Sequence, residues 1–187
     1  MKRLYEYLAP CRKEEEVKAE FCKFFKMKIF ALRGIDHYTE QVLFEFKYDR
    51  NFKSPENMAR VLAQVMYYAR MLKFGAGLTR YPLPPAICVV DKNEAFFAET
   101  KDFAKFYASK GDRYDWDRAP STPCPRLVAD VLDHLTRRRG DAESVSHPCF
   151  AAFPPSRWAE AATGSGRRGR CGRVSRTRRP PRGTGRA

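Results

Sequence analysis

Long apolar runs are missing from this sequence. No stretch approaches the roughly 18 apolar residues that a membrane-spanning helix needs, and Met1–Glu16 lacks the apolar core of a secretory signal peptide. The six cysteines form no CxxC pair, so we expect free thiols in a reducing compartment. These absences predict a cytoplasmic protein that does not interact with a membrane.

Lysine is missing after Lys110, and apolar residues are scarce in Gly164–Ala187. This last stretch is rich in Gly, Arg and Pro and cannot bury enough apolar surface to fold alone. We therefore expect residues 141–187 to form a disordered basic tail that attracts nucleic acid. The abrupt loss of lysine also points to a foreign or frame-shifted terminus.

The composition predicts one folded domain with additional material, because 43% of the 187 residues are hydrophobic. The net charge is +14, and the residues from 141 onward contribute ten Arg and three acids to it. The first 140 residues keep 26 basic and 19 acidic side chains. This moderately basic part favours a polyanionic partner such as DNA, although a solubilising surface has the same composition.

The most informative stretch is Gly34–Asp49, with the sequence GIDHYTEQVLFEFKYD. Its β-branched and aromatic residues predict a strand over Gln41–Tyr48. Since side chains alternate along a strand, Glu45 and Lys47 share one face. The other face carries Phe44, Phe46 and Tyr48. Two charged groups on an otherwise apolar strand are costly to bury without a partner or a chemical role.

Asp36 supplies a second carboxylate nine residues before Glu45. We predict a short strand over Lys28–Arg33 and a hairpin around Thr39–Gln41 that carries Asp36 on one arm and Glu45 on the other. The two acids would hold a hard divalent cation through oxygen, and Lys47 would neutralise a phosphate or orient a water. Alternatively, Asp36 caps a turn and the charged strand residues pair with each other.

A helix is predicted over Lys13–Lys26. Its apolar stripe contains Val17, Phe21, Phe24 and Phe25. Glutamates crowd its first turns, where acids suit the helix dipole. One of them also fits the role of a metal ligand: Glu20 lies at the edge of the stripe and Glu16 one turn earlier, and helical geometry leaves both open.

A longer helix is predicted over Pro55–Lys73, with Ser54 as its N-cap and Gly75 at its end. Gln64 and Tyr68 are four residues apart and therefore neighbours on one face. They fit a role in hydrogen bonding to the site or to a DNA backbone, and ordinary helix surface is the alternative.

The remaining elements follow from shorter patterns. Ala86–Val90 (AICVV) predicts a buried strand, and Ala95–Ala98 its return strand after a turn. We further predict a short helix over Asp102–Ser109, a loop over Gly111–Pro125 and an appended helix over Arg126–Arg138. The resulting fold class is α/β, with a mixed sheet flanked by helices.

The order of these motifs resembles the PD-(D/E)XK nuclease superfamily. The motifs are a helix with glutamates, then Asp36, then Glu45-Phe46-Lys47, then Gln64-x-x-x-Tyr68 and a buried strand. Gln64 and Tyr68 look like the QxxxY motif of the RecB-like and type I restriction-subunit branches. Residues 12–118 are also similar to the N-terminal region of large bacterial restriction–modification methylases. Ile35 departs from the family pattern, which has proline before the aspartate, and no methyltransferase motif is present.

The resemblance implies a mixed αβββαβ sheet core in a nuclease-like domain over residues 1–118, an appended helix over 119–140 and the tail over 141–187. It further implies a Mg²⁺-dependent DNA endonuclease of restriction–modification or phage-defence type. The alternative is an inactive nuclease-fold module that binds DNA or a protein, such as a fragment of a DNA methyltransferase fusion. The implied partners are DNA and a methyltransferase or helicase component.

The resemblance also assigns roles to individual residues. Asp36 and Glu45 would bind Mg²⁺, with Glu20 or Glu16 completing the metal shell. Lys47 would be the catalytic lysine. Gln64 and Tyr68 would position the site or the DNA.

Overall fold

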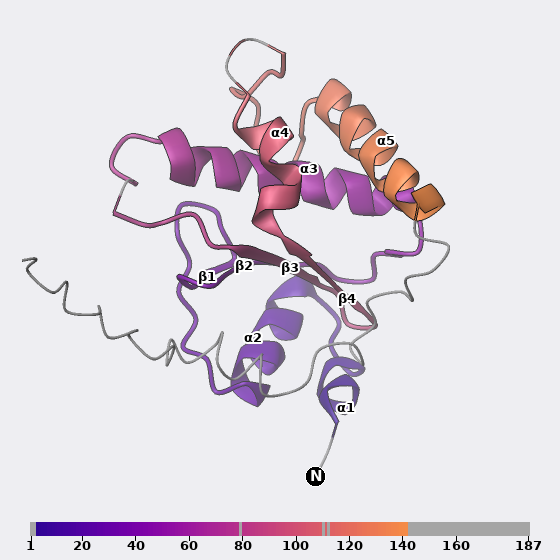
Figure 1. Cartoon of the computed structure of the whole chain (residues 1–187). Coiled ribbons are helices and arrows are strands. Elements are labelled where there is room, and N and C mark those ends of the chain that lie inside the picture. Colours follow the sequence, from indigo (N-terminus) through magenta and orange to yellow (C-terminus); the bar gives the residue numbers. More distant parts are fainter. Residues whose placement is uncertain (1–2, 79, 110, 112, 142–187) are drawn as a thin grey trace, which may run out of the picture.

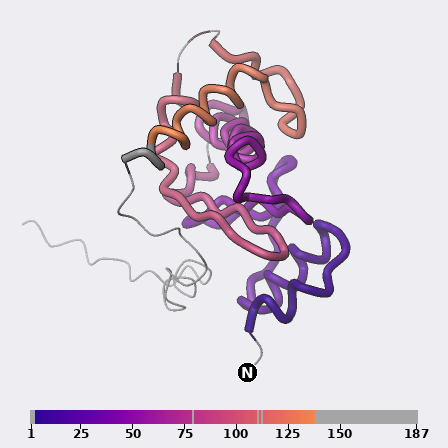
Figure 2. The backbone as a smooth tube through the Cα atoms, turned by 90° about the vertical axis from the view of Figure 1, so that its right-hand side faces the viewer, coloured from indigo at the N-terminus to yellow at the C-terminus, as the bar shows by residue number. Residues whose placement is uncertain are grey.

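The computed structural model describes residues 3–78, 80–109, 111 and 113–141. The predicted disordered tail, except for residue 141, lies outside these residues. A four-stranded sheet forms the middle layer, and helices cover both of its faces (Figure 1). The helices on one face are α1 (Leu4–Leu8) and α2 (Glu14–Phe24), and those on the other are α3 (Pro55–Phe74), α4 (Ala104–Tyr107) and α5 (Pro125–Asp141). The side view in Figure 2 separates the same two helical layers.

The sheet is mixed and has the order β1-β2-β3-β4. Its strands are β1 (His37–Tyr38), β2 (Val42–Phe46), β3 (Ala86–Val90) and β4 (Ala95–Glu99). β1 and β2 form the predicted antiparallel hairpin, β2 and β3 are parallel, and β4 returns antiparallel to β3. The parallel pair is joined through α3, which is the crossover that parallel strands require.

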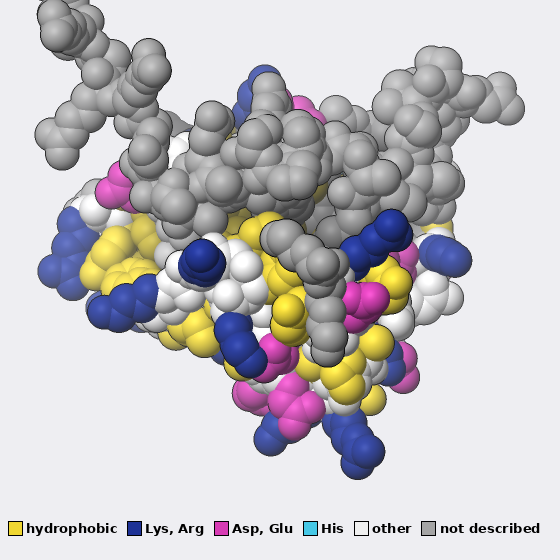
Figure 3. All heavy atoms as spheres, turned by 90° about the horizontal axis from the view of Figure 1, so that it is seen from below, with side chains coloured by type: hydrophobic (Ala, Val, Ile, Leu, Met, Phe, Trp, Pro, Cys, Tyr) yellow, Lys and Arg dark blue, Asp and Glu magenta, His cyan; other side chains and the backbone are white. Residues whose placement is uncertain are grey.

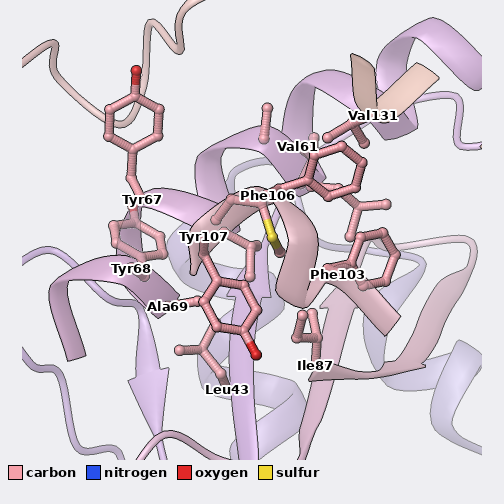
Figure 4. Packing of buried hydrophobic residues seen from close by; sticks show 14 of the residues in the cluster. Leu43, Val61, Tyr67, Tyr68, Ala69, Ile87, Phe103, Phe106, Tyr107 and Val131 are labelled. Atoms are coloured by element: carbon pink, nitrogen blue, oxygen red, sulfur yellow. The ribbon is translucent and has the colours of Figure 1, made fainter. Parts of the chain in front are cut away.

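Two hydrophobic cores follow from the alternation of side chains along the central strands. Leu43, Ile87 and Val89 pack against α3, α4 and α5. Figure 4 shows part of this core, with Leu43 and Ile87 at the level of the sheet. On the opposite face, Phe44 and Phe46 pack against Phe21 of α2, with ring centroids 5.9 and 5.4 Å apart.

Helix α3 begins and ends at the predicted signals. Ser54 accepts a hydrogen bond from Asn57 N at 3.3 Å, and Pro55 is the first helical residue. At the other end, Gly75 has φ −71° and its N–H bonds Met71 O at 2.7 Å. A Cβ at Gly75 would collide with this carbonyl, so the absence of a side chain, and not a left-handed backbone, explains the glycine.

The predicted strand over Lys28–Arg33 is wrong. Residues 28–31 have no regular structure, and Leu32 forms only an isolated bridge with Ile35. Phe30 O does accept from Tyr38 N at 2.9 Å, but Phe30 N donates to the ring Nδ1 of His37 at 3.0 Å. The His37 side chain therefore takes the place of a backbone hydrogen-bond acceptor, and no further strand pairing forms at Phe30. The predicted turn at Gly34 is present, with φ +87°, a conformation that glycine adopts without strain.

Other differences are local. Helix α1 was not predicted, because its five residues are too short for a periodic signal. The predicted helix over Asp102–Ser109 is a 3₁₀ turn, η1 (Thr100–Phe103), followed by α4. The predicted helix over Arg126–Arg138 is α5. Its Leu127 and Val131 pack in the same hydrophobic core as the apolar residues of α3.

We predicted from the sequence that the chain has no membrane-spanning helix and that its cysteines are free thiols. In the described ranges, no helix combines the length and the apolar character needed to cross a membrane. Cys11, Cys22, Cys88 and Cys124 are buried free thiols, as predicted.

Candidate active site

The hairpin brings Asp36 to Glu45. His37 pairs with Phe44, and Tyr38 pairs with Leu43, so Asp36, which directly precedes β1, comes close to the end of β2. Asp36 Oδ2 accepts a hydrogen bond from Phe46 N at 2.9 Å, which holds its carboxylate there, one residue from Glu45.

Glu45 is buried, with only 1% of its surface exposed. Its Oε1 accepts from Lys47 Nζ and from Gln64 Nε2, both at 2.6 Å. Its Oε2 is also buried, and no group in the described residues forms a hydrogen bond with it. A carboxylate in this position is costly unless it is protonated or meets a further cation.

Burial raises the pKa of Glu45 to about 8, and Lys47 only partly offsets this effect. The negative charges of Asp36 and Glu14 raise it further. Glu45 therefore keeps its proton to a higher pH than an exposed glutamate does. Such a perturbed acid is typical of functional sites, although ion-pair networks also produce it.

Lys47 lies at the centre of the charged cluster. Its Nζ contacts Glu45 Oε1 at 2.6 Å, both carboxylate oxygens of Glu14 at 3.4 Å and Phe46 O at 2.9 Å. Burial alone would lower the pKa of Lys47, but the carboxylates of Glu45 and Glu14 outweigh it and raise that pKa. Lys47 therefore remains an ammonium and shares its charge between a strand and a helix.

The α2 glutamate in this cluster is Glu14. Glu20 instead pairs with Lys23 at 3.1 Å, and Glu16 accepts from Arg12 N at 2.7 Å. The structure therefore brings Glu14, and neither Glu20 nor Glu16, to Lys47. Burial raises the pKa of Glu14, with Lys47 opposing the shift.

Lys18 is a second residue that sequence reasoning missed. Its Nζ lies 3.5 Å from Asp36 Oδ1. Lys18 follows Glu14 by four residues, so both project from one face of α2. The four-residue spacing of Glu14 and Lys18 next to the apolar Val17 could have indicated that both side chains reach the site. Four glutamates in the first turns made this pair hard to single out.

Gln64 and Tyr68 reach the site as neighbours on α3. Gln64 Nε2 donates to Tyr68 Oη at 2.9 Å as well as to Glu45. Figure 4 shows that Tyr68 lies closer to the sheet than Tyr67. Burial and the charge of Glu45 raise the pKa of Tyr68, so its hydroxyl stays protonated. The pair is therefore part of a buried network and not ordinary helix surface.

The carboxylates have the chemistry that Mg²⁺ requires. Within the described part of the chain, no cluster of three or more His, Cys, Asp or Glu side chains is arranged to hold a metal ion. Mg²⁺ needs only one or two carboxylates, because it retains several waters and binds substrate oxygens. Asp36 and Glu45 supply hard oxygen donors, and the unpartnered Oε2 of Glu45 offers a free ligand atom.

The surroundings of the cluster carry both signs of charge. Figure 3, which looks onto the side of α1 and α2, shows acidic and basic side chains next to each other on the described part of that face. A cavity of about 220 Å³ lies elsewhere, beside the C-terminal half of α3. It is lined by Tyr67, Arg70, Met71, Phe74, Gly75 and Trp116, none of which belongs to the charged cluster.

Comparison of the chain with protein-family models, with curated proteins and with solved structures found no match. The function of the chain has to be inferred from the geometry of the charged cluster.

Proposed function

We propose that this chain is a Mg²⁺-dependent nuclease of the PD-(D/E)XK type that hydrolyses phosphodiester bonds in DNA. The main support is Glu45. This buried carboxyl adjoins Phe46, whose backbone N–H donates to Asp36, and it has one oxygen bound by Lys47 and Gln64 and the other unpartnered. A divalent cation at the two carboxylates would relieve the cost of burying them.

Asp36 and Glu45 would hold the cation in this proposal. When bound, Mg²⁺ supplies Lewis acidity and lowers the pKa of a coordinated water. Gln64 fixes the carboxylate of Glu45 through its 2.6 Å hydrogen bond. Lys47 keeps a positive charge beside that carboxylate and would stabilise the charge of a phosphate.

The arrangement of elements gives partial support. The order helix, hairpin, helix and parallel strand corresponds to most of the expected αβββαβ core. The remaining strand is absent: residues 28–31 have no regular structure, and Phe30 O accepts a single hydrogen bond from Tyr38 N. The net charge of +14 favours a nucleic acid as the partner.

A second function is supported by the ion pairs themselves. Lys47 contacts Glu45 and Glu14, and Lys18 contacts Asp36, so each of these carboxylates already has an ammonium partner. A cluster neutralised in this way fits an inactive nuclease-fold module that binds DNA or a protein.

Cleavage of supercoiled plasmid in Mg²⁺ separates the two functions. We expect Asp36→Ala and Lys47→Ala to abolish cleavage while DNA binding remains largely intact. Lys53→Ala and Glu15→Ala remove exposed charges outside the cluster and should leave cleavage unchanged. Equal cleavage by the wild type and all four variants would show that the charged cluster does not catalyse the cleavage. Binding without any cleavage by the wild type would support the inactive module.

A further inference from the structure

Lys18 is a cation that the proposed reaction does not yet use. Its Nζ lies 3.5 Å from Asp36 Oδ1, and its side chain is 23% exposed. Lys47, in contrast, is 11% exposed and has Glu45 and Glu14 as partners. Lys18 is thus the more accessible ammonium of the cluster, and it pairs with one of the two carboxylates that would bind the metal.

We propose that Lys18 is a second DNA-phosphate ligand of this site, held by Asp36 until a divalent cation takes over that carboxylate. This inference rests on the proposed nuclease function. Binding of the metal to Asp36 would free the ammonium group of Lys18, which could then contact a phosphate of the DNA.

The charge of the cluster supports this role. Its carboxylates are Glu14, Asp36 and Glu45, and its ammonium groups are Lys18 and Lys47. Once a divalent cation is bound and the carboxylates are ionised, this cluster has a net charge of +1. A phosphodiester carries one negative charge and would neutralise it. Without Lys18 the loaded cluster would have no surplus charge for the phosphate.

The geometry of the side chain is compatible with the exchange. Lysine is a compact point charge on a flexible four-carbon stem and binds phosphate without a fixed orientation. Helix α2 holds its backbone, because the preceding Val17 is fully buried in the core beneath it. Only the outer part of the Lys18 side chain has to turn from the carboxylate toward the substrate.

Metal binding gives the first test, and it needs no catalytic activity. Titration of Mn²⁺ into metal-free Lys18→Ala, followed by electron paramagnetic resonance, should show about tenfold tighter binding than in the wild type, because a competing unit charge near the protein surface is gone. Lys23→Ala is the matched control, since Lys23 lies on the same helix and pairs with Glu20. It should bind Mn²⁺ like the wild type.

DNA binding gives the second test. In Ca²⁺, with the DNA checked to be uncut, Lys18→Ala should reduce the salt dependence of binding by about one phosphate contact, a change of roughly 0.9 in the slope of log K against log salt. In EDTA the slope should not change, because Lys18 is then held by Asp36. Lys18→Arg should keep the wild-type slope, and circular dichroism of each variant verifies that it is folded.

The outcomes separate this inference from the function on which it rests. If the wild type binds no divalent cation, the nuclease proposal and the role of Lys18 both fail. If the wild type binds metal and cuts DNA while Lys18→Ala behaves like Lys23→Ala in both titrations, only the role of Lys18 is overturned. A reduced slope in EDTA as well as in Ca²⁺ would also overturn it, since Lys18 would then contact DNA without being released.

Discussion

Lys47 Nζ lies 2.6 Å from Glu45 Oε1, so the two charged residues of one strand face contact each other directly. The acid is 1% exposed, and the single ammonium is shared with Glu14. The ammonium of Lys47 therefore only partly offsets the cost of burying the Glu45 carboxylate, and burial raises the pKa of Glu45 to about 8. This relationship makes the stability of the protein, and the metal binding that we propose, depend on pH.

Glu45→Gln should stabilise the protein at alkaline pH. The folded pKa of about 8 lies above the usual value of 4.5 for a glutamate, so the stabilising effect of the proton is fully present below pH ~4.5 and is lost as pH rises through 8. Glutamine cannot ionise, and we expect the variant to exceed the wild type by about 2–4 kcal/mol at pH 9. The difference should shrink toward pH 4 in urea unfolding. Glu15→Gln, at an exposed position of α2, should track the wild type, and parallel curves for Glu45→Gln would contradict the raised pKa.

Divalent metal should bind more tightly as pH rises toward 8. A metal ligand must be deprotonated, and Glu45 holds a proton below its pKa of about 8. We expect affinity to fall about tenfold for each pH unit below this value, with release of close to one proton. Calorimetry of Mg²⁺ binding in two buffers with different ionisation enthalpies measures that proton. Loss of the pH dependence in Glu45→Gln would assign it to this residue, and proton-free binding by the wild type at pH 6 would exclude Glu45 as a ligand.

Gln64→Ala should cost more stability than Tyr68→Phe. Gln64 Nε2 donates to both Glu45 Oε1 and Tyr68 Oη, at 2.6 and 2.9 Å, and its loss leaves a buried acceptor with one fewer donor. We expect about 1–3 kcal/mol for Gln64→Ala and about 1 kcal/mol or less for Tyr68→Phe. Chemical denaturation gives both values. Arg60→Ala, at an exposed position of the same helix, controls for general effects of substitution, and a reversed order of the two effects would mean that the Tyr68 hydroxyl contributes more to the network than Gln64.

Deleting residues 142–187 should weaken DNA binding without abolishing cleavage. The deleted segment contains ten arginines, each of which adds to the salt dependence when it contacts a phosphate. We expect a lower affinity and a shallower salt slope, while the Mg²⁺-dependent reaction persists in the remaining chain. Fluorescence anisotropy across a salt series measures the slope. Complete loss of binding would show that the basic surface of the remaining chain is not the DNA site.

Local sequence signals predicted the elements that depend on local physics. Helix α3 begins after Ser54 and ends before Gly75 because a cap and a missing side chain act within one turn of the helix. The alternation around Glu45 and Lys47 predicted that the two share a face, because the strand period is a property of the backbone. A hairpin around Thr39–Gln41 was also predicted, but its first arm is β1 and not the predicted strand over Lys28–Arg33.

The sequence by itself determined strands β2, β3 and β4 and the long helix α3, since these follow from periodicity, caps and turns. It did not give β1, and it placed a strand over Lys28–Arg33 that the structure lacks. Only the tertiary structure decided which glutamate joins the cluster, because the position of Glu14 depends on how α2 packs on the sheet. It also decided that Lys18 meets Asp36 and that Glu45 has a raised pKa. Burial and contacts between distant segments are properties of the packed chain, and no local pattern specifies them.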